Sequence, residues 1–173
     1  MSNFKYIITI ILLSVTSMCF AQRKNFSGTW MLSDQKSISG NLYQNGVPKK
    51  IHVRQETEKM DVEKTTFGQG DNYNQAVVET LYYNGKPFNA VSPSKKKKVI
   101  TMKWLNNSTG FVVTVLFKNP IDNNKFDIKV TDTWSLNNEG DLIFIRKNEN
   151  LLNGEIWESR SVYEKKSDNV QVN

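Results

Sequence analysis

The chain has 173 residues, a formal net charge of +6 and 11% aromatic residues, but only one cysteine and one histidine. A lone histidine and a lone cysteine argue against a Cys/His metal site and against a Cys–His nucleophile, and no glycine-rich phosphate loop precedes a helix. We therefore expect no metal, no cofactor and no enzymatic activity, with distant carboxylate pairs as the one catalytic alternative left open.

Residues 1–21 have the features of a cleaved signal peptide. A lysine precedes an apolar run, and Cys19 and Ala21 are small residues at the two positions that a signal peptidase reads. We therefore expect one mature domain over 22–173, exported through the general secretory route to the periplasm or the extracellular space. A lipid anchor on Cys19 is the alternative, although Met18 lies where a lipobox has a small residue.

The rest of the chain predicts an antiparallel all-β domain. Short segments rich in Val, Ile, Thr and aromatic residues alternate with Asn/Gly/Asp clusters, and we find no long apolar pattern of helical period. This pattern predicts a single up-and-down β-barrel of about 8–10 strands. The expected strands lie near 26–32, 50–56, 59–66, 75–83, 87–91, 97–105, 110–118, 125–136, 141–148 and 155–165.

The first strand carries a buried tryptophan two residues after a glycine. Phe26, Gly28, Trp30 and Leu32 share one face, because side chains alternate along a strand. Gly28 has no side chain, so a large group can lie against the backbone there.

The connections between strands are expected to be hairpins. Asn84-Gly85 is the strongest two-residue turn signal in the chain. The segments 104–113 and 134–144 resemble one another, since each runs from a tryptophan through an Asn/Gly loop into an apolar strand. This weak repeat is typical of a meander of antiparallel strands. Residues 34–49 contain two glycines and a proline, which predicts a loop over the barrel mouth rather than a helical lid.

An acidic side chain interrupts the apolar face of the strand at 125–136. Asp132 lies between Val130 and Trp134, where an unpaired charge would be costly. The register that we predict for the last hairpin has three pairs: Leu136 with Leu142, Trp134 with Phe144, and Asp132 with Arg146. Either Asp132 and Arg146 form a structural ion pair, or they orient the polar head of a ligand.

The only run of like charge follows Pro93-Ser94 and consists of Lys95, Lys96, Lys97 and Lys98. It could contact an anionic envelope surface. The alternative is a solvated turn and strand start, where lysines discourage pairing at a sheet edge. Nucleic acid is not an expected partner of an exported protein.

Both ends of the domain resemble the calycins, which include lipocalins and fatty-acid-binding proteins. The similar segments are Phe26-Ser27-Gly28-Thr29-Trp30, Gly140-Asp141-Leu142-Ile143-Phe144 and Ser161-Val162-Tyr163-Glu164-Lys165. The resemblance implies a calycin-like barrel with Trp30 plugging one end, covered by a cation from Arg160 as in lipocalins. The carboxylate clamp of fatty-acid-binding proteins is not carried over, because Ser161 occupies the position of its arginine.

The chain is thus similar to the short lipocalin-like secreted proteins of bacteria. This similarity implies binding of a small apolar or amphipathic molecule inside the barrel. The expected ligand-lining residues are Met102, Trp104, Phe111, Val130, Asp132, Trp134, Phe144 and Arg146. The alternative is a module of the cell envelope that binds another protein through its outer faces and the loops 33–49 and 67–74, with Tyr43, Phe67 and Tyr73 as contacts and a barrel filled by its own side chains.

Overall fold

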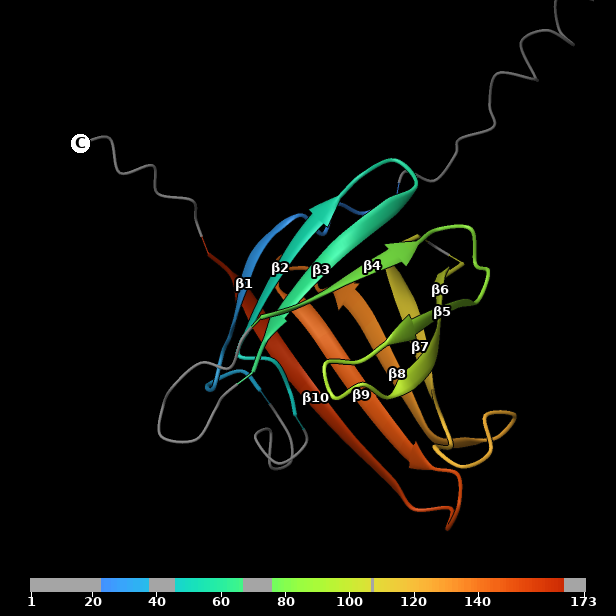
Figure 1. The fold of residues 1–173 in the computed structure, drawn as a ribbon. Helices are drawn as coiled ribbons and strands as arrows, with labels where there is room; N and C mark the ends of the chain where they lie inside the picture. Colours follow the sequence, from blue (N-terminus) through green and yellow to red (C-terminus); the bar gives the residue numbers. More distant parts are fainter. Residues whose placement is uncertain (1–22, 38–45, 67–75, 107, 167–173) are drawn as a thin grey trace, which may run out of the picture.

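The computed structural model describes residues 23–37, 46–66, 76–106 and 108–166. All ten predicted strands are confirmed, with ends that differ by at most two residues, and the described residues contain no helix (Figure 1). The strands are β1 (Gly28–Leu32), β2 (Lys50–Gln55), β3 (Lys59–Thr65), β4 (Val77–Tyr82), β5 (Phe88–Val91), β6 (Lys97–Trp104), β7 (Gly110–Lys118), β8 (Phe126–Leu136), β9 (Leu142–Asn150) and β10 (Ile156–Lys165).

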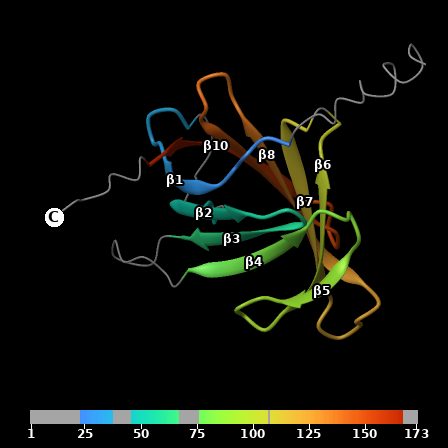
Figure 2. The same ribbon diagram turned by 90° about the horizontal axis from the view of Figure 1, so that it is seen from above.

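The ten strands form one antiparallel sheet in the order β4-β3-β2-β1-β10-β9-β8-β7-β6-β5. Every neighbouring pair is adjacent in sequence except β1 and β10, which join the two ends of the domain. The sheet curls into a half-barrel around its apolar face (Figures 1 and 2). This architecture is compatible with a calycin-like fold, and it confirms the predicted all-β class.

The sheet has two edges, β4 and β5, and they do not pair with each other. The turn at Asn84-Gly85 is present, with Gly85 at a φ of 69°, but the hairpin that we predicted around it is not. Pro87 has no N–H to donate where a ladder would start. A ring contact between Tyr82 and Phe88, at 5.2 Å between centroids, bridges the two edges next to the turn instead.

The register that we predicted for the hairpin of β8 and β9 is confirmed in all three pairs. Leu136 lies opposite Leu142, Trp134 opposite Phe144 and Asp132 opposite Arg146. The two similar segments, 104–113 and 134–144, are both hairpins, β6–β7 and β8–β9. Period-two alternation therefore fixed which residues of the neighbouring strands β6, β7, β8 and β9 face inward.

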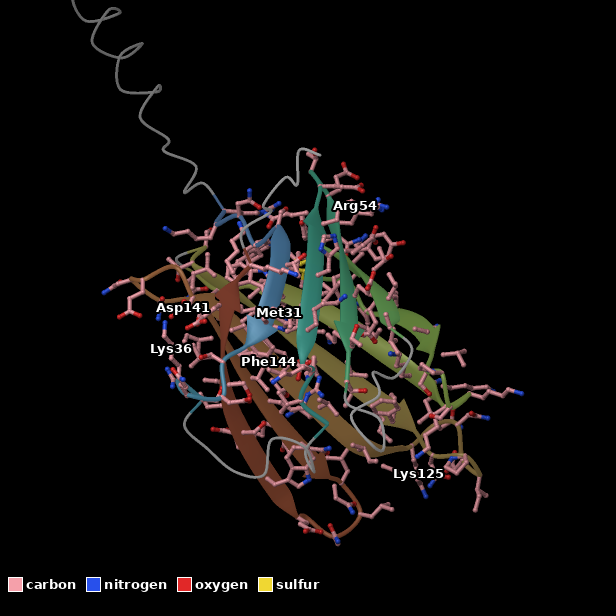
Figure 3. All side chains as sticks on the ribbon, turned by 90° about the vertical axis from the view of Figure 1, so that its left-hand side faces the viewer. Met31, Lys36, Arg54, Lys125, Asp141 and Phe144 are labelled. Atoms are coloured by element: carbon pink, nitrogen blue, oxygen red, sulfur yellow. The ribbon has the colours of Figure 1, made fainter. Side chains whose placement is uncertain are left out.

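Aromatic side chains fill one end of the half-barrel, which we call the aromatic end. Phe26 packs edge-on against Phe111, which stacks on Trp134, which in turn meets Phe144 edge-on. These four side chains have no exposed surface. The Trp30 indole is also buried, and its Nε1 donates a hydrogen bond to the Phe26 carbonyl oxygen at 2.9 Å. Outside this core, Lys36 and Asp141 form an ion pair at 2.9 Å beside β1 (Figure 3).

Lys165, rather than Arg160, supplies the cation above Trp30. Its Nζ lies 5.5 Å from the indole centroid, because β1 and β10 pair Trp30 with Lys165. Arg160 lies five residues earlier on β10, opposite Ile145, so the expected Trp30–Arg160 contact does not fit this register. The lysine stem crosses Gly28, where an added Cβ would come within 2.5 Å of its Cε. This is the close approach that the missing side chain of Gly28 predicted.

Candidate functional site

The other end of the interior, which we call the charged end, carries ionisable side chains from five strands. Their side chains face the interior, because each lies two residues from an inward apolar residue of the same strand. The five residues are Lys64 of β3, Glu79 of β4, Lys98 of β6, Asp132 of β8 and Arg146 of β9. We refer to them as the charged cluster.

Asp132 and Arg146 form a two-pronged ion pair across β8 and β9. Arg146 Nε donates to Asp132 Oδ1 at 2.8 Å, and Arg146 Nη2 donates to Oδ2 at 2.7 Å. The Asp132 side chain is only 2% exposed, so it depends on these partners for solvation. Lys64 Nζ approaches Asp132 Oδ2 at 3.4 Å and adds a second cation to the same carboxylate.

Glu79 extends the cluster across the unpaired edges of the sheet. Its carboxylate accepts from Lys64 Nζ at 3.2 Å and is also paired with Lys98. Since Glu79 lies on β4 and Lys98 on β6, their ion pair connects the two halves of the sheet where no backbone ladder does. The cluster is therefore an alternating chain of charges, Arg146–Asp132–Lys64–Glu79–Lys98, with a cation at each end.

The two carboxylates of the cluster stay ionised down to low pH. The nearby Lys64 ammonium, with help from Lys98 and against the effect of burial, lowers the pKa of Glu79 to about 2. Burial alone would raise the pKa of Asp132, but Arg146 and Lys64 outweigh burial and hold it below its ordinary value. With three formal cations and two carboxylates, the cluster carries one surplus positive charge.

The charged cluster lines an open cavity of about 360 Å³. An apolar wall stands beside the charges, made mainly by Val115, Phe117, Val130 and Trp157. A site that combines apolar walls with a few convergent polar groups is the usual form of a small-molecule site, and this volume lies near the lower end of the usual range. The cavity thus combines an apolar wall and charged groups within one small volume.

The segment 46–48 crosses the inner face of β9 and β10 at one side of the cavity. Arg146 Nη1 donates to the Gly46 carbonyl oxygen at 2.9 Å, and the Tyr163 hydroxyl donates to that of Pro48 at 2.7 Å. Ser159 and Ser161 lie on the same inner face of β10, and their buried hydroxyls have no hydrogen-bond partner among the described residues. Such hydroxyls are spare polar groups close to Arg146.

Three of the eight predicted ligand-lining residues line this cavity, namely Val130, Asp132 and Arg146. The other five belong to the core of the aromatic end: Met102, Phe111, Trp134 and Phe144 are fully buried, and Trp104 packs against them. Their side chains pack together in the core, so these five residues do not line the cavity at the charged end. The tertiary structure therefore divides the predicted set into a core and a site.

Sequence reasoning overlooked Lys64 and Glu79 and assigned Lys98 to a surface contact, although the same signal marks all three as inward residues. Lys64 follows Met60 and Val62 at period two, and Lys98 precedes Ile100 in the same way. Glu79 likewise lies two residues before the buried Leu81. Each is a charged residue on an apolar strand face, as Asp132 is, so the rule that singled out Asp132 could have found them.

Several other predicted features lie away from the cavity or outside the described residues. Lys95, Lys96 and Lys97 are exposed, whereas Lys98 is buried in the cluster. His52 points outward, as its strand position predicts, and its Nδ1 lies 3.0 Å from the Thr29 hydroxyl. The signal-peptide residues and the aromatic residues Tyr43, Phe67 and Tyr73 lie outside the described residues.

No group of three or more His, Cys, Asp or Glu side chains in the described ranges could hold a metal ion. Among these residues, no helix is both long and apolar enough to cross a bilayer.

Comparison with known proteins adds no assignment: no family model matches the chain, and no curated protein matches its sequence.

Proposed function

We propose that this protein is an exported, lipocalin-like binding protein that holds a small amphipathic anion in the cavity at its charged end. The observation that carries the proposal is the surplus positive charge of the charged cluster beside an apolar wall, in a cavity of about 360 Å³. The wall would hold the apolar part of the ligand by burial, and the cations would hold its anionic group.

The order of charges in the cluster favours an anion over a cation. Each carboxylate already lies between two cations, so an incoming cation would find no carboxylate with only one partner. Arg146 and Lys98 end the chain of charges, and both line the cavity. An anion bound between them would gain a partner at each end without breaking an existing ion pair.

A series of short amphiphiles with the same chain tests the sign of the ligand charge. We expect octanoate to bind in isothermal titration calorimetry, octanol to bind more weakly and octylammonium not to bind. The heat should fall with added salt, because the attraction to an anion is electrostatic. Equal affinity for octanoate and octylammonium, or no binding of either, would contradict the proposal.

Two single substitutions change the surplus charge in opposite directions. Lys98→Met removes the surplus and should weaken octanoate binding about tenfold, whereas Glu79→Gln raises it and should strengthen binding by a smaller factor. Lys103→Met, at an exposed position on the outer face of β6, is the matched control and should leave the affinity unchanged. If Lys98→Met and Lys103→Met weaken binding equally, the cavity is not the site.

A further inference from the structure

Two kinds of exposed side chain gather around the open mouth of the half-barrel. One kind is basic and lies on the β5–β6 turn, with the half-buried Lys118 at the end of β7 beside it. The other kind is aliphatic and lies on the tips of the β7–β8 and β9–β10 loops. In Figure 1 these connections all lie at the lower side of the half-barrel.

The basic residues surround a groove of about 460 Å³ between the β5–β6 turn and the β7–β8 loop. Lys95, Lys96, Lys97 and Lys118 line it, and none of the four has a salt bridge to a carboxylate of the described residues. The remaining charges of this region are Lys125, which projects from the rim (Figure 3), Asp122 and Asp127. The groove and the β7–β8 loop therefore carry five cations against two carboxylates, and the β9–β10 loop adds one further carboxylate, Glu155.

The aliphatic residues are exposed to solvent on turns that side-chain hydrogen bonds stabilise. Ile121 is 94% exposed, and its backbone N–H donates to Asn119 Oδ1 at 2.8 Å. Leu152 is 72% exposed, and its N–H donates in the same way to Asn150 Oδ1 at 3.0 Å. A backbone hydrogen bond of 2.8 Å from Leu151 to Asp127 ties the β9–β10 loop to the start of β8. The two tips are thus neighbouring, shaped projections.

We infer that the mouth of the half-barrel docks on an anionic lipid surface, with Ile121 and Leu152 entering the headgroup region and the groove lysines contacting lipid phosphates. Clustered lysines beside exposed aliphatic side chains are the combination that binds anionic membranes. A nucleic acid would call for exposed aromatic side chains on which bases stack, and the tips of these described loops carry none. The inference does not depend on a ligand in the cavity.

Vesicle sedimentation tests the charge part of the inference. We expect the protein to sediment with vesicles of equal parts phosphatidylglycerol and phosphatidylcholine but not with pure phosphatidylcholine, and to be released by salt. Changing Lys95, Lys96, Lys97 and Lys118 together to Gln should weaken vesicle binding at least about tenfold. The matched control changes Lys24, Lys86, Lys103 and Lys166, which are exposed elsewhere, and should change binding by less than about twofold.

A second pair of variants tests the aliphatic tips. Ile121→Asp with Leu152→Asp should also reduce binding to anionic vesicles severalfold, while Val78→Asp, at an exposed position on β4, should not. All of these substitutions lie on the surface, so thermal unfolding should confirm that each variant is folded. No binding to anionic vesicles at low salt, or equal losses in both lysine variants, would overturn the inference. Tighter binding to a single-stranded oligonucleotide than to vesicles would overturn the choice of a lipid partner.

Discussion

The two ends of the half-barrel are built from the same strands but are stabilised in different ways. At the aromatic end, inward side chains contact one another directly, from Phe26 through Phe111 and Trp134 to Phe144. At the charged end, other inward positions carry ionised side chains. The Glu79–Lys98 pair joins β4 to β6 where the edges of the sheet are unpaired, and a cavity lies beside these charges. Burial predicts that the aromatic end provides most of the stability, whereas the charged end holds the cavity in which we propose that a ligand binds.

A matched pair of tryptophan substitutions should show the largest difference in stability between the two ends. Trp134→Ala removes a fully buried indole from the aromatic end and should lower the free energy of unfolding by about 3–5 kcal/mol. Trp157→Ala removes a half-buried indole from the cavity wall and should cost about 1 kcal/mol. Urea unfolding followed by circular dichroism measures both. Similar losses would show that the two ends contribute equally to stability.

A double-mutant cycle on Asp132 and Arg146 tests whether the charged end acts as a unit. Asp132→Leu leaves Arg146 without its two-pronged partner and should cost about 3 kcal/mol of unfolding free energy. Adding Arg146→Met should restore most of this loss, because it removes the buried guanidinium that Asp132→Leu leaves without its carboxylate. Additive losses in the double variant would mean that the pair is not coupled in stability.

Acid should weaken the charged end selectively. The pKa of Glu79 is depressed in the folded protein, so its contribution is present above its ordinary pKa and is lost as the pH falls toward about 2. Asp132 acts in the same direction. We expect the loss of unfolding free energy from about pH 7 to about pH 3 to be smaller in Glu79→Gln by about 2 kcal/mol. An identical loss in both proteins would contradict the ion pairing of Glu79.

Two glycine substitutions give the smallest expected difference between the ends. Gly28→Ala, at a φ of 130°, strains the backbone and displaces the Lys165 stem from Trp30, so it should cost about 2 kcal/mol. Gly154→Ala, in the β9–β10 loop at a φ of 75°, meets no neighbouring atom and should cost about 1 kcal/mol. Thermal unfolding distinguishes them, and the quenching of tryptophan fluorescence should change only in the first. A larger loss in Gly154→Ala would contradict the role of Lys165 as the cover of this end.

The ten strands, their inward faces and the pairing of Asp132 with Arg146 follow from the sequence alone. Period-two alternation and turn residues are local properties, and a hairpin register follows from them once one pair is fixed. Period two also marked Lys64, Glu79 and Lys98 as charged residues on apolar faces, so these three were within reach of the same reasoning.

Which inward residues form a core and which line a cavity depends on the tertiary structure. The pairing of Trp30 with Lys165 rather than a contact with Arg160 depends on how β1 meets β10, across nearly the whole length of the chain. The cluster likewise joins strands that are distant in sequence. Its Glu79–Lys98 pair lies where β4 and β5, the two edges of the curled sheet, do not pair with each other. Alternation gives the face of a side chain, but its height in the barrel and its neighbours across the interior are set by the curvature and closure of the whole sheet.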